Sequence, residues 1–337
     1  RGLLLAVYTS TNAAAGNAVL AFDRARGGGL TPAGSYPTGG TGTGGGLGNQ
    51  GALAIAGHRL YAVNAGSGDI SVFALRHHGL TLLQRVPSGG ARPISLTVSD
   101  GLLYAVNAGG AGNVAGFRIG ERGRLRAIPG AVQPLAGAGP AQISFAPDGR
   151  TLVVTEKATN SIDTFAVGRG GRAAPAVSHV SNGATPFGFA FDPAGHAIVS
   201  EAHGGAAGAS TVSSYDVRGG AFASISVSVP DFQGAACWVA VTRGGRFAYV
   251  TNTASNNVSG YRIAADGSLS LLDHSGVTAP TGAAPTDVAD GAEGHALFVL
   301  NSGDGTISSY RQRFDGSLVA SGTVGGVPAG ATGLIAE

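Results

Sequence analysis

Two glutamates stand at equivalent points of a pattern that this 337-residue sequence repeats. The polar residue closing the pattern is Asn64, Asn107, Asn252 or Asn301 in four copies, and Glu156 or Glu201 in two. Paired carboxyl groups beside a cavity can act as an ionised base and a protonated acid. The pattern therefore makes Glu201 a candidate general base and Glu156 its partner or the acid. The alternative is structural: each glutamate, like the asparagine it replaces, hydrogen-bonds the backbone at a turn.

Lys157, the only lysine in the sequence, follows Glu156 directly. Together with Arg92 it could bind a substrate carboxylate or stabilise an oxyanion. The alternative is a solvated loop lysine that pairs with Glu156. Two cations offer few donors for a phosphate group, which usually needs several. We therefore expect a carboxylated or neutral ligand rather than a sugar phosphate.

Cys237 and Trp238 are the only cysteine and the only tryptophan, and they are adjacent. A thiolate nucleophile needs a nearby base or cation, for which His203 is the candidate. The alternative for Cys237 is an inert buried side chain. Trp238 and Phe187 are predicted to form an apolar wall for a ligand, with core packing as the alternative.

Three amide side chains could orient a carbonyl group or a water molecule, and these are Asn49, Gln50 and Gln142. Asp287 adds a further carboxylate, and such hard oxygen ligands would suit Ca²⁺. No metal site and no cofactor is nevertheless expected. The glycine-rich run 38–50 lacks the Lys-Ser/Thr ending of a phosphate-binding loop, so it is predicted to be a flexible access loop.

The repeat itself is most evident where "LYAVNAGSGDISVF" at 60–73 returns as "LYAVNAGGAGNVAGF" at 103–117. Looser copies occupy 153–165, 198–215, 249–261 and 298–310, and a seventh, 6–22, stands at the front. Successive closing residues are 43 to 51 residues apart, which is the size of a four-stranded propeller blade.

An apolar strand is predicted before each internal copy, and turn signals such as "APDGR" join the two. These innermost strands are predicted at 49–55, 92–98, 139–145, 185–191, 236–241 and 284–290. The chain ends in "GATGLIAE", an innermost strand without partners, and begins with second and third strands. The two ends are therefore predicted to complete one blade. We expect an all-β, seven-bladed propeller with four antiparallel strands per blade, in one domain covering 1–337.

In a propeller, innermost strands begin at the face where second strands turn into third strands. The candidate residues, far apart in sequence, are therefore predicted to meet at one mouth of the central channel. A Ser-His-Asp arrangement cannot be assembled from them.

The composition argues against a nucleic-acid-binding protein and against a membrane-spanning protein. The net charge of +2 is too small to argue for nucleic acid or acidic membranes, and the arginines are scattered along the sequence. No apolar run reaches the roughly 18 residues of a membrane span. Because the sequence begins with Arg1 instead of Met, a secreted or periplasmic protein is favoured over a cytoplasmic one. The oligomeric state is not indicated.

The "YVTN" element at 249–252, the "PDGR" turn and the seven blades resemble the lactonase-like β-propellers, which include phosphogluconolactonase-like and carboxymuconate-cyclase-like proteins. The resemblance implies a substrate site at one channel mouth. It also implies a catalytic Glu at the end of a second strand, which Glu201 in "VSEA" matches. The family's His and Arg at innermost-strand starts have no counterpart in 140–142 or 186–188.

Two hypotheses follow. The first is a lactonase-type hydrolase that acts on a small cyclic ester or related carboxylate by carboxylate acid-base catalysis; isomerase or cyclase chemistry would use the same groups. The second is a non-catalytic, exported propeller that binds a ligand or a protein.

Overall fold

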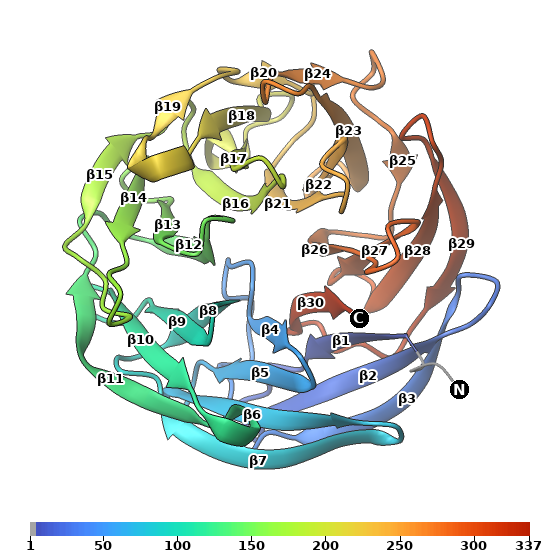
Figure 1. The fold of residues 1–337 in the computed structure, drawn as a ribbon. Coiled ribbons are helices and arrows are strands. Elements are labelled where there is room, and N and C mark those ends of the chain that lie inside the picture. Colours follow the sequence, from blue (N-terminus) through green and yellow to red (C-terminus); the bar gives the residue numbers. More distant parts are fainter. Residues whose placement is uncertain (1–4) are drawn as a thin grey trace.

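Seven antiparallel sheets surround a central axis in the computed structural model, which describes residues 5–337 (Figure 1). Helix is confined to three 3₁₀ turns in the described chain, η1 (Glu121–Gly123), η2 (His203–Gly205) and η3 (Arg218–Gly220). No helix of this part of the chain has the length and apolar character needed to cross a membrane. The prediction of an all-β, seven-bladed propeller is confirmed.

Six blades follow one another along the chain, each running from the channel to the rim. Blade 1 contains β4 (Leu53–Ala56), β5 (Arg59–Asn64), β6 (Asp69–Arg76) and β7 (Gly79–Pro87). Blade 2 contains β8 (Pro93–Ser99), β9 (Leu102–Asn107), β10 (Asn113–Ile119) and β11 (Leu125–Pro134). Blade 3 contains β12 (Pro140–Phe145), β13 (Thr151–Glu156), β14 (Ser161–Ala166) and β15 (Val177–Val180).

The fourth strand is divided in the next two blades. Blade 4 contains β16 (Pro186–Phe191), β17 (His196–Glu201), β18 (Thr211–Asp216), β19 (Ala223–Ser224) and β20 (Val229–Pro230). Blade 5 contains β21 (Ala236–Val241), β22 (Phe247–Asn252), β23 (Asn257–Ile263), β24 (Leu269–Leu271) and β25 (Ala279–Pro280). Blade 6 contains β26 (Pro285–Asp290), β27 (Ala296–Asn301), β28 (Thr306–Gln312) and β29 (Leu318–Val324).

Blade 7 joins the two ends of the chain, as predicted. Its outer strands are β1 (Ala6–Ser10), β2 (Ala18–Arg24) and β3 (Leu30–Pro37), and its innermost strand is β30 (Thr332–Ala336). Val7 pairs with Ala336 and Thr9 with Leu334, so strands from opposite ends of the sequence share one ladder. This pairing closes the ring and covers sheet edges that would otherwise be open.

The apolar core lies between neighbouring blades, because each sheet buries both faces only against its neighbours. The repeated tyrosines of the second strands also connect blades. The hydroxyl of Tyr61 donates to Gly123 O (3.0 Å), that of Tyr104 to Gly171 O (2.5 Å), and that of Tyr249 to Gly316 O (2.7 Å). Each bond reaches a turn in the next blade, so one residue of the repeat both fills the core and joins two sheets.

The topology gives the ring two different faces. The loop face carries the turns from second to third strands and the connections between blades. The hairpin face carries the turns from first to second and from third to fourth strands. The second-strand ends, Glu156 and Glu201 included, lie toward the loop face, as predicted.

Leu334→Ala should lower the free energy of unfolding by about 2–5 kcal/mol, because it removes a buried side chain from the ring-closing core. Leu334 is 8% exposed and packs in one cluster with Val7 and Phe298. Denaturant unfolding would measure the change. Leu82→Ala on outermost strand β7, where Leu82 is 42% exposed, is the control and should cost much less. Equal losses would contradict the importance of the closing blade.

Candidate functional site

The channel mouth on the loop face is filled by residues 47–51, the plug segment, which precedes β4. In Figure 1 it is part of the blue loop that runs into the middle of the ring. The amide of Gln50 donates to Ala141 O (3.0 Å), and Gly51 O accepts from the amide of Leu96 (2.7 Å). The hydroxyl of Thr332 donates to Asn49 Oδ1 (2.8 Å). The segment thus contacts blades 2, 3 and 7 and is not the free access loop that its glycines suggested.

Two glutamines that were predicted to orient a substrate are bonded to backbone instead. Gln50 Nε2 donates to Val239 O (2.7 Å) while its Oε1 accepts from the Val239 amide (3.0 Å). Gln142 forms the same pair of bonds with Phe189, at 2.9 and 2.8 Å. Asn49 Nδ2 donates to Ile94 O. Because both ends of each glutamine amide have partners, these side chains hold the plug and the inner strands together.

Lys157, Phe187 and Trp238 do come together, as the sequence predicted. Lys157 Nζ lies 4.8 Å from the centroid of the Phe187 ring and donates to Gly48 O of the plug segment. The rings of Phe187 and Trp238 meet edge to face at 4.9 Å, and Trp238 Nε1 donates to Asn49 O (2.7 Å). Both rings are buried, so the packing alternative accounts for most of their surface.

The surroundings of Lys157 lower the pKa of its amine. Burial lowers the pKa of Lys157; Cys237 acts in the opposite direction, and the positive charge of Arg92 lowers it further. Arg92 itself is exposed. A lower pKa makes the neutral form of the amine, which can accept a proton, easier to reach.

Cys237 is unsuited to nucleophilic attack in this setting. Burial raises the pKa of its thiol to about 12, in spite of the opposing influence of Lys157. His203, the base considered for it, bonds through Nε2 to Thr211 Oγ1 (2.7 Å). The inert interpretation of Cys237 therefore fits better.

Burial likewise raises the pKa of Asp287 well above its ordinary value, and its Oδ1 accepts from the Val288 amide (2.8 Å).

Both glutamate side chains are 0% exposed and have the partners of a structural residue. Ser213 Oγ donates to Glu201 Oε1, and Ser228 Oγ lies 3.2 Å from Glu201 Oε2. Three of the four asparagines at the same position bond the equivalent third-strand residue, whereas Asn107 bonds Ser88 O and Asn113 Oδ1. These pairs are Asn64 with Ser71 (2.9 Å), Asn252 with Ser259 (2.8 Å) and Asn301 with Ser308 (2.9 Å). The catalytic roles of Glu201 and Glu156 remain predictions, and neither carboxyl group is exposed at the mouth.

Glycines in the blade-to-blade loops cover these two carboxyl groups. A Cβ atom on Gly183 would lie 1.8 Å from Glu201 Oε2, and one on Gly137 would lie 1.7 Å from Glu156 Oε2. Gly137 and Gly183 each precede the proline of the next innermost strand by three residues. The absence of a side chain at these positions is what lets the loop close over the carboxylate.

The carboxyl partner of Glu156 is Asp163, not Glu201. The pKa of Glu156 is raised to about 8, first by burial and then by hydrogen bonding to Asp163 and by the charge of that residue. Asp163 is buried on β14 and accepts through Oδ2 from the Ala136 amide (2.7 Å). The sequence analysis missed Asp163. The signal was available, because it stands two residues after the start of a third strand, where other blades carry serine.

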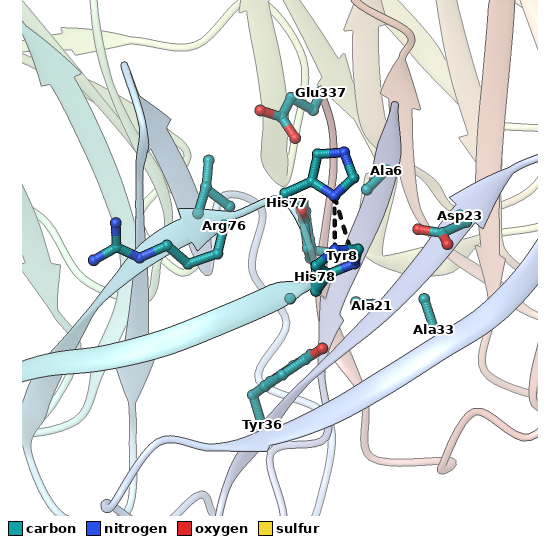
Figure 2. A pocket seen from close by; sticks show the side chains of 12 residues that line it. Ala6, Tyr8, Ala21, Asp23, Ala33, Tyr36, Arg76, His77, His78 and Glu337 are labelled. Carbon is teal, nitrogen blue, oxygen red and sulfur yellow. Dashed lines mark hydrogen bonds between the residues drawn. The ribbon is translucent and has the colours of Figure 1, made fainter. Parts of the chain in front are cut away.

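Five well-formed cavities of the described chain lie away from this mouth. The one in Figure 2 has a volume of about 240 Å³ and lies at the hairpin face, between blades 7 and 1. Its polar lining includes Tyr8, Asp23, Tyr36, His77 and His78, and the two histidines are exposed. Within residues 5–337, no three His, Cys, Asp or Glu side chains converge to hold a metal ion.

Gly183→Ala should lower the free energy of unfolding by about 1–3 kcal/mol, because its methyl group would collide with the buried carboxylate. Gly46→Ala is the matched control, since a Cβ there meets nothing within 4 Å. In Glu201→Ala, which makes room, the added cost of Gly183→Ala should shrink. A cost that is the same in both backgrounds would show that the loop does not rest on Glu201.

The raised pKa of Glu156 should make the free energy of unfolding decrease as pH rises. The unfolded carboxyl group titrates near 4.5 and the folded one near 8, so the native state keeps an extra proton between these values. Stability is thus lost as pH rises through this window. Asp231 and Asp290, whose pKa values burial raises to about 6, add to the loss only in its lower part.

Thermal unfolding of wild type and Glu156→Gln at pH 6 and pH 8 would measure this effect. The wild-type melting temperature should fall more than that of the variant, while the exposed Glu121→Gln should follow wild type. Parallel curves for all three proteins would refute the extra proton on Glu156.

Comparison with known proteins agrees with the architecture. Residues 115–207 match the family described as Lactonase, 7-bladed beta-propeller. No curated protein sequence matches the chain.

Solved structures that cover nearly all of the chain include the following three. One is a Lactobacillus plantarum protein (20% identity, 99% of each chain, TM-score 0.78). Another is a "putative 6-phosphogluconolactonase" of Bacteroides uniformis (18% identity, 98% of this chain and 99% of that one, TM-score 0.76). The third is the periplasmic gluconolactonase of Pseudomonas aeruginosa (16% identity, 98% of each chain, TM-score 0.76). Identities this low show the fold alone.

The comparisons therefore agree with the resemblance that the repeats indicated: the chain is a seven-bladed propeller, and its residues 115–207 are similar to the lactonase family.

Proposed function

We propose that the protein is a lactonase-like enzyme that opens a small carboxylated or neutral cyclic ester at the loop-face mouth. The observation that carries the proposal is the partly buried Lys157, held against Phe187 and beside Trp238, with the charge of Arg92 close by. The resemblance to lactonase-like propellers implies a substrate site at a channel mouth, and the family match and the fold of the gluconolactonase neighbour support the reaction class.

The chemistry needs a base, an oxyanion partner and an apolar wall. The neutral amine of Lys157 takes a proton from a water molecule as its oxygen attacks the ester carbonyl carbon. The guanidinium of Arg92 stabilises the oxyanion. When the bond to the ring oxygen breaks, the leaving alkoxide takes up the proton from Lys157, and the product is a hydroxy acid. The edges of Phe187 and Trp238 bound the ring of the substrate.

This proposal moves the base from Glu201, which the sequence suggested, to Lys157. The reason is access: the Glu201 side chain is 0% exposed and lies under Gly183, whereas Lys157 is partly exposed. In this arrangement Glu156 and Glu201 hold the turns that carry Lys157 and His203.

Lys157→Arg should lower kcat by about 10²–10⁴-fold, because it keeps the positive charge but removes the titratable base. Acid release from a panel of carboxylated, phosphorylated and neutral lactones, followed by pH-stat, is the measurement. Wild-type kcat should rise with pH through the lowered pKa of Lys157, since the neutral amine is the active form. Glu201→Gln, which replaces the carboxyl group with a neutral amide of the same shape, is the companion variant and should keep most of the activity.

Loss of activity in Glu201→Gln but not in Lys157→Arg, with both proteins folded, would return the base to Glu201. The absence of turnover on every lactone would reject the enzyme and favour the second candidate, a non-catalytic binding propeller. The observation that supports this candidate is the plug segment, whose bonds to blades 2, 3, 5 and 7 fill the mouth.

A further inference from the structure

The arginines, scattered in the sequence, gather on one face of the ring. Every described arginine except Arg85 and Arg92 lies in a turn of the hairpin face or within two residues of one. All seven blades contribute at least one. All of these side chains except Arg24 and Arg59 are exposed.

The charge of the two faces is opposite in sign. Seventeen arginines and eleven carboxylates share the hairpin face, an excess of six positive charges. The remaining described residues carry three basic and eight acidic side chains, and burial raises the pKa of two of these acids, Glu156 and Asp287. The small net charge of the sequence therefore does not show how unevenly the basic side chains are distributed between the two faces.

Some of these arginines bond to neighbouring blades and are therefore not counted as available for a ligand. Arg59 Nε donates to Arg122 O (2.6 Å), Arg118 Nη2 to Gly170 O (3.1 Å) and Arg243 Nη1 to Ala292 O (2.8 Å), and each bond joins neighbouring blades. Others form no side-chain hydrogen bond or ion pair with residues 5–337. They include Arg124, Arg126, Arg169, Arg311 and Arg313, whose guanidinium groups are free for a ligand.

An exposed aromatic ring projects from the same face. Phe314, at the tip of the β28–β29 hairpin, is 84% exposed, and the guanidinium of Arg246 lies 4.5 Å from its centroid. Arg313 precedes it in the chain. Aromatic rings flanked by cations are typical of segments that lie at the headgroup level of a membrane.

A cavity of about 390 Å³ opens beside this face between blades 6 and 7. Arg24, Arg26 and Arg311 contribute to its lining. Arg24 Nε and Nη1 are buried and have no hydrogen-bond partner among the described residues, and its closest carboxylate oxygen is Glu293 Oε2, 4.0 Å from Nη2. A guanidinium with unused donors is suited to a phosphate group.

We propose that the hairpin face docks flat on an anionic phospholipid surface, with the arginines on lipid phosphates and Phe314 in the interfacial layer. The distribution of the arginines favours a flat, extended target. A target as wide as the ring can contact arginines from all seven blades, whereas a nucleic-acid duplex is too narrow to contact them all. Docking in this orientation leaves the loop face open to solution. The inference does not rest on the proposed enzymatic function.

Sedimentation with vesicles tests the proposal on the full chain. The protein should bind vesicles containing phosphatidylglycerol and not vesicles of phosphatidylcholine alone, and added salt should release it. Arg124→Ser/Arg126→Ser and Arg311→Ser/Arg313→Ser should each weaken binding about twentyfold, at about fivefold per arginine. Ala14→Glu/Ala254→Glu changes the net charge equally on the loop face, at two exposed turn positions, and should bind nearly as wild type. Melting temperatures confirm that each variant folds.

The variant Phe314→Ser distinguishes binding to a membrane from binding to any polyanion. It should weaken binding to anionic vesicles and leave any binding to duplex DNA unchanged. No sedimentation with anionic vesicles at low salt would overturn the proposal, as would equal losses in the loop-face control. Tighter binding to duplex DNA than to vesicles, lost in the arginine variants, would assign the face to nucleic acid instead.

Discussion

The pairing of β1 with β30 is the interaction on which the rest of the ring depends. A single blade exposes two apolar faces, and it buries them only when neighbours stand on both sides. An open series of blades would leave such faces at each end. The ladder between Val7–Ser10 and Thr332–Ala336 removes both ends, using strands that are more than 300 residues apart in the chain. Every other contact between blades, including the bonds of Tyr61, Tyr104 and Tyr249 to the next blade, presupposes this closure.

The closing residue of the repeat illustrates how one position can serve two purposes. Asn64, Asn252 and Asn301 join second and third strands through a serine hydroxyl, and Glu201 accepts from a serine at the same place. Replacement of an amide by a carboxylate adds a desolvation cost, and in blade 3 burial and the neighbouring Asp163 raise the pKa of Glu156, so that protonation lowers this cost. A carboxyl group with a raised pKa is therefore not in itself a sign of catalysis here. Access to the mouth distinguishes Lys157 from the glutamates.

The two faces of the ring have separate chemistry because of the direction in which the strands run. Turns between second and third strands carry Lys157 and His203 on the face where the plug segment crosses the channel mouth. Turns on the other face carry nearly all the arginines and the exposed Phe314. A molecule with a ligand site at one face and a cationic, partly apolar surface at the other can be held at a boundary while its site remains accessible.

The sequence by itself determined the number of blades, the strands within them and the closure of the ring. These follow from local patterns: alternation of apolar residues, turn residues at regular spacing, and incomplete repeats at the two ends. The innermost strands were predicted to within one residue of their observed first residues in five of six cases. The exception was β4, which begins at Leu53 rather than Asn49, because Asn49 and Gln50 belong to the plug segment and bond across the channel.

Tertiary structure alone decided which side chains are accessible. The burial of Glu156 and Glu201, the partnership with Asp163, the plug and the arginine face all depend on residues from different strands and blades meeting in space. Such meetings leave no mark in the spacing along the chain, because the ring converts one linear repeat into two faces and a filled centre.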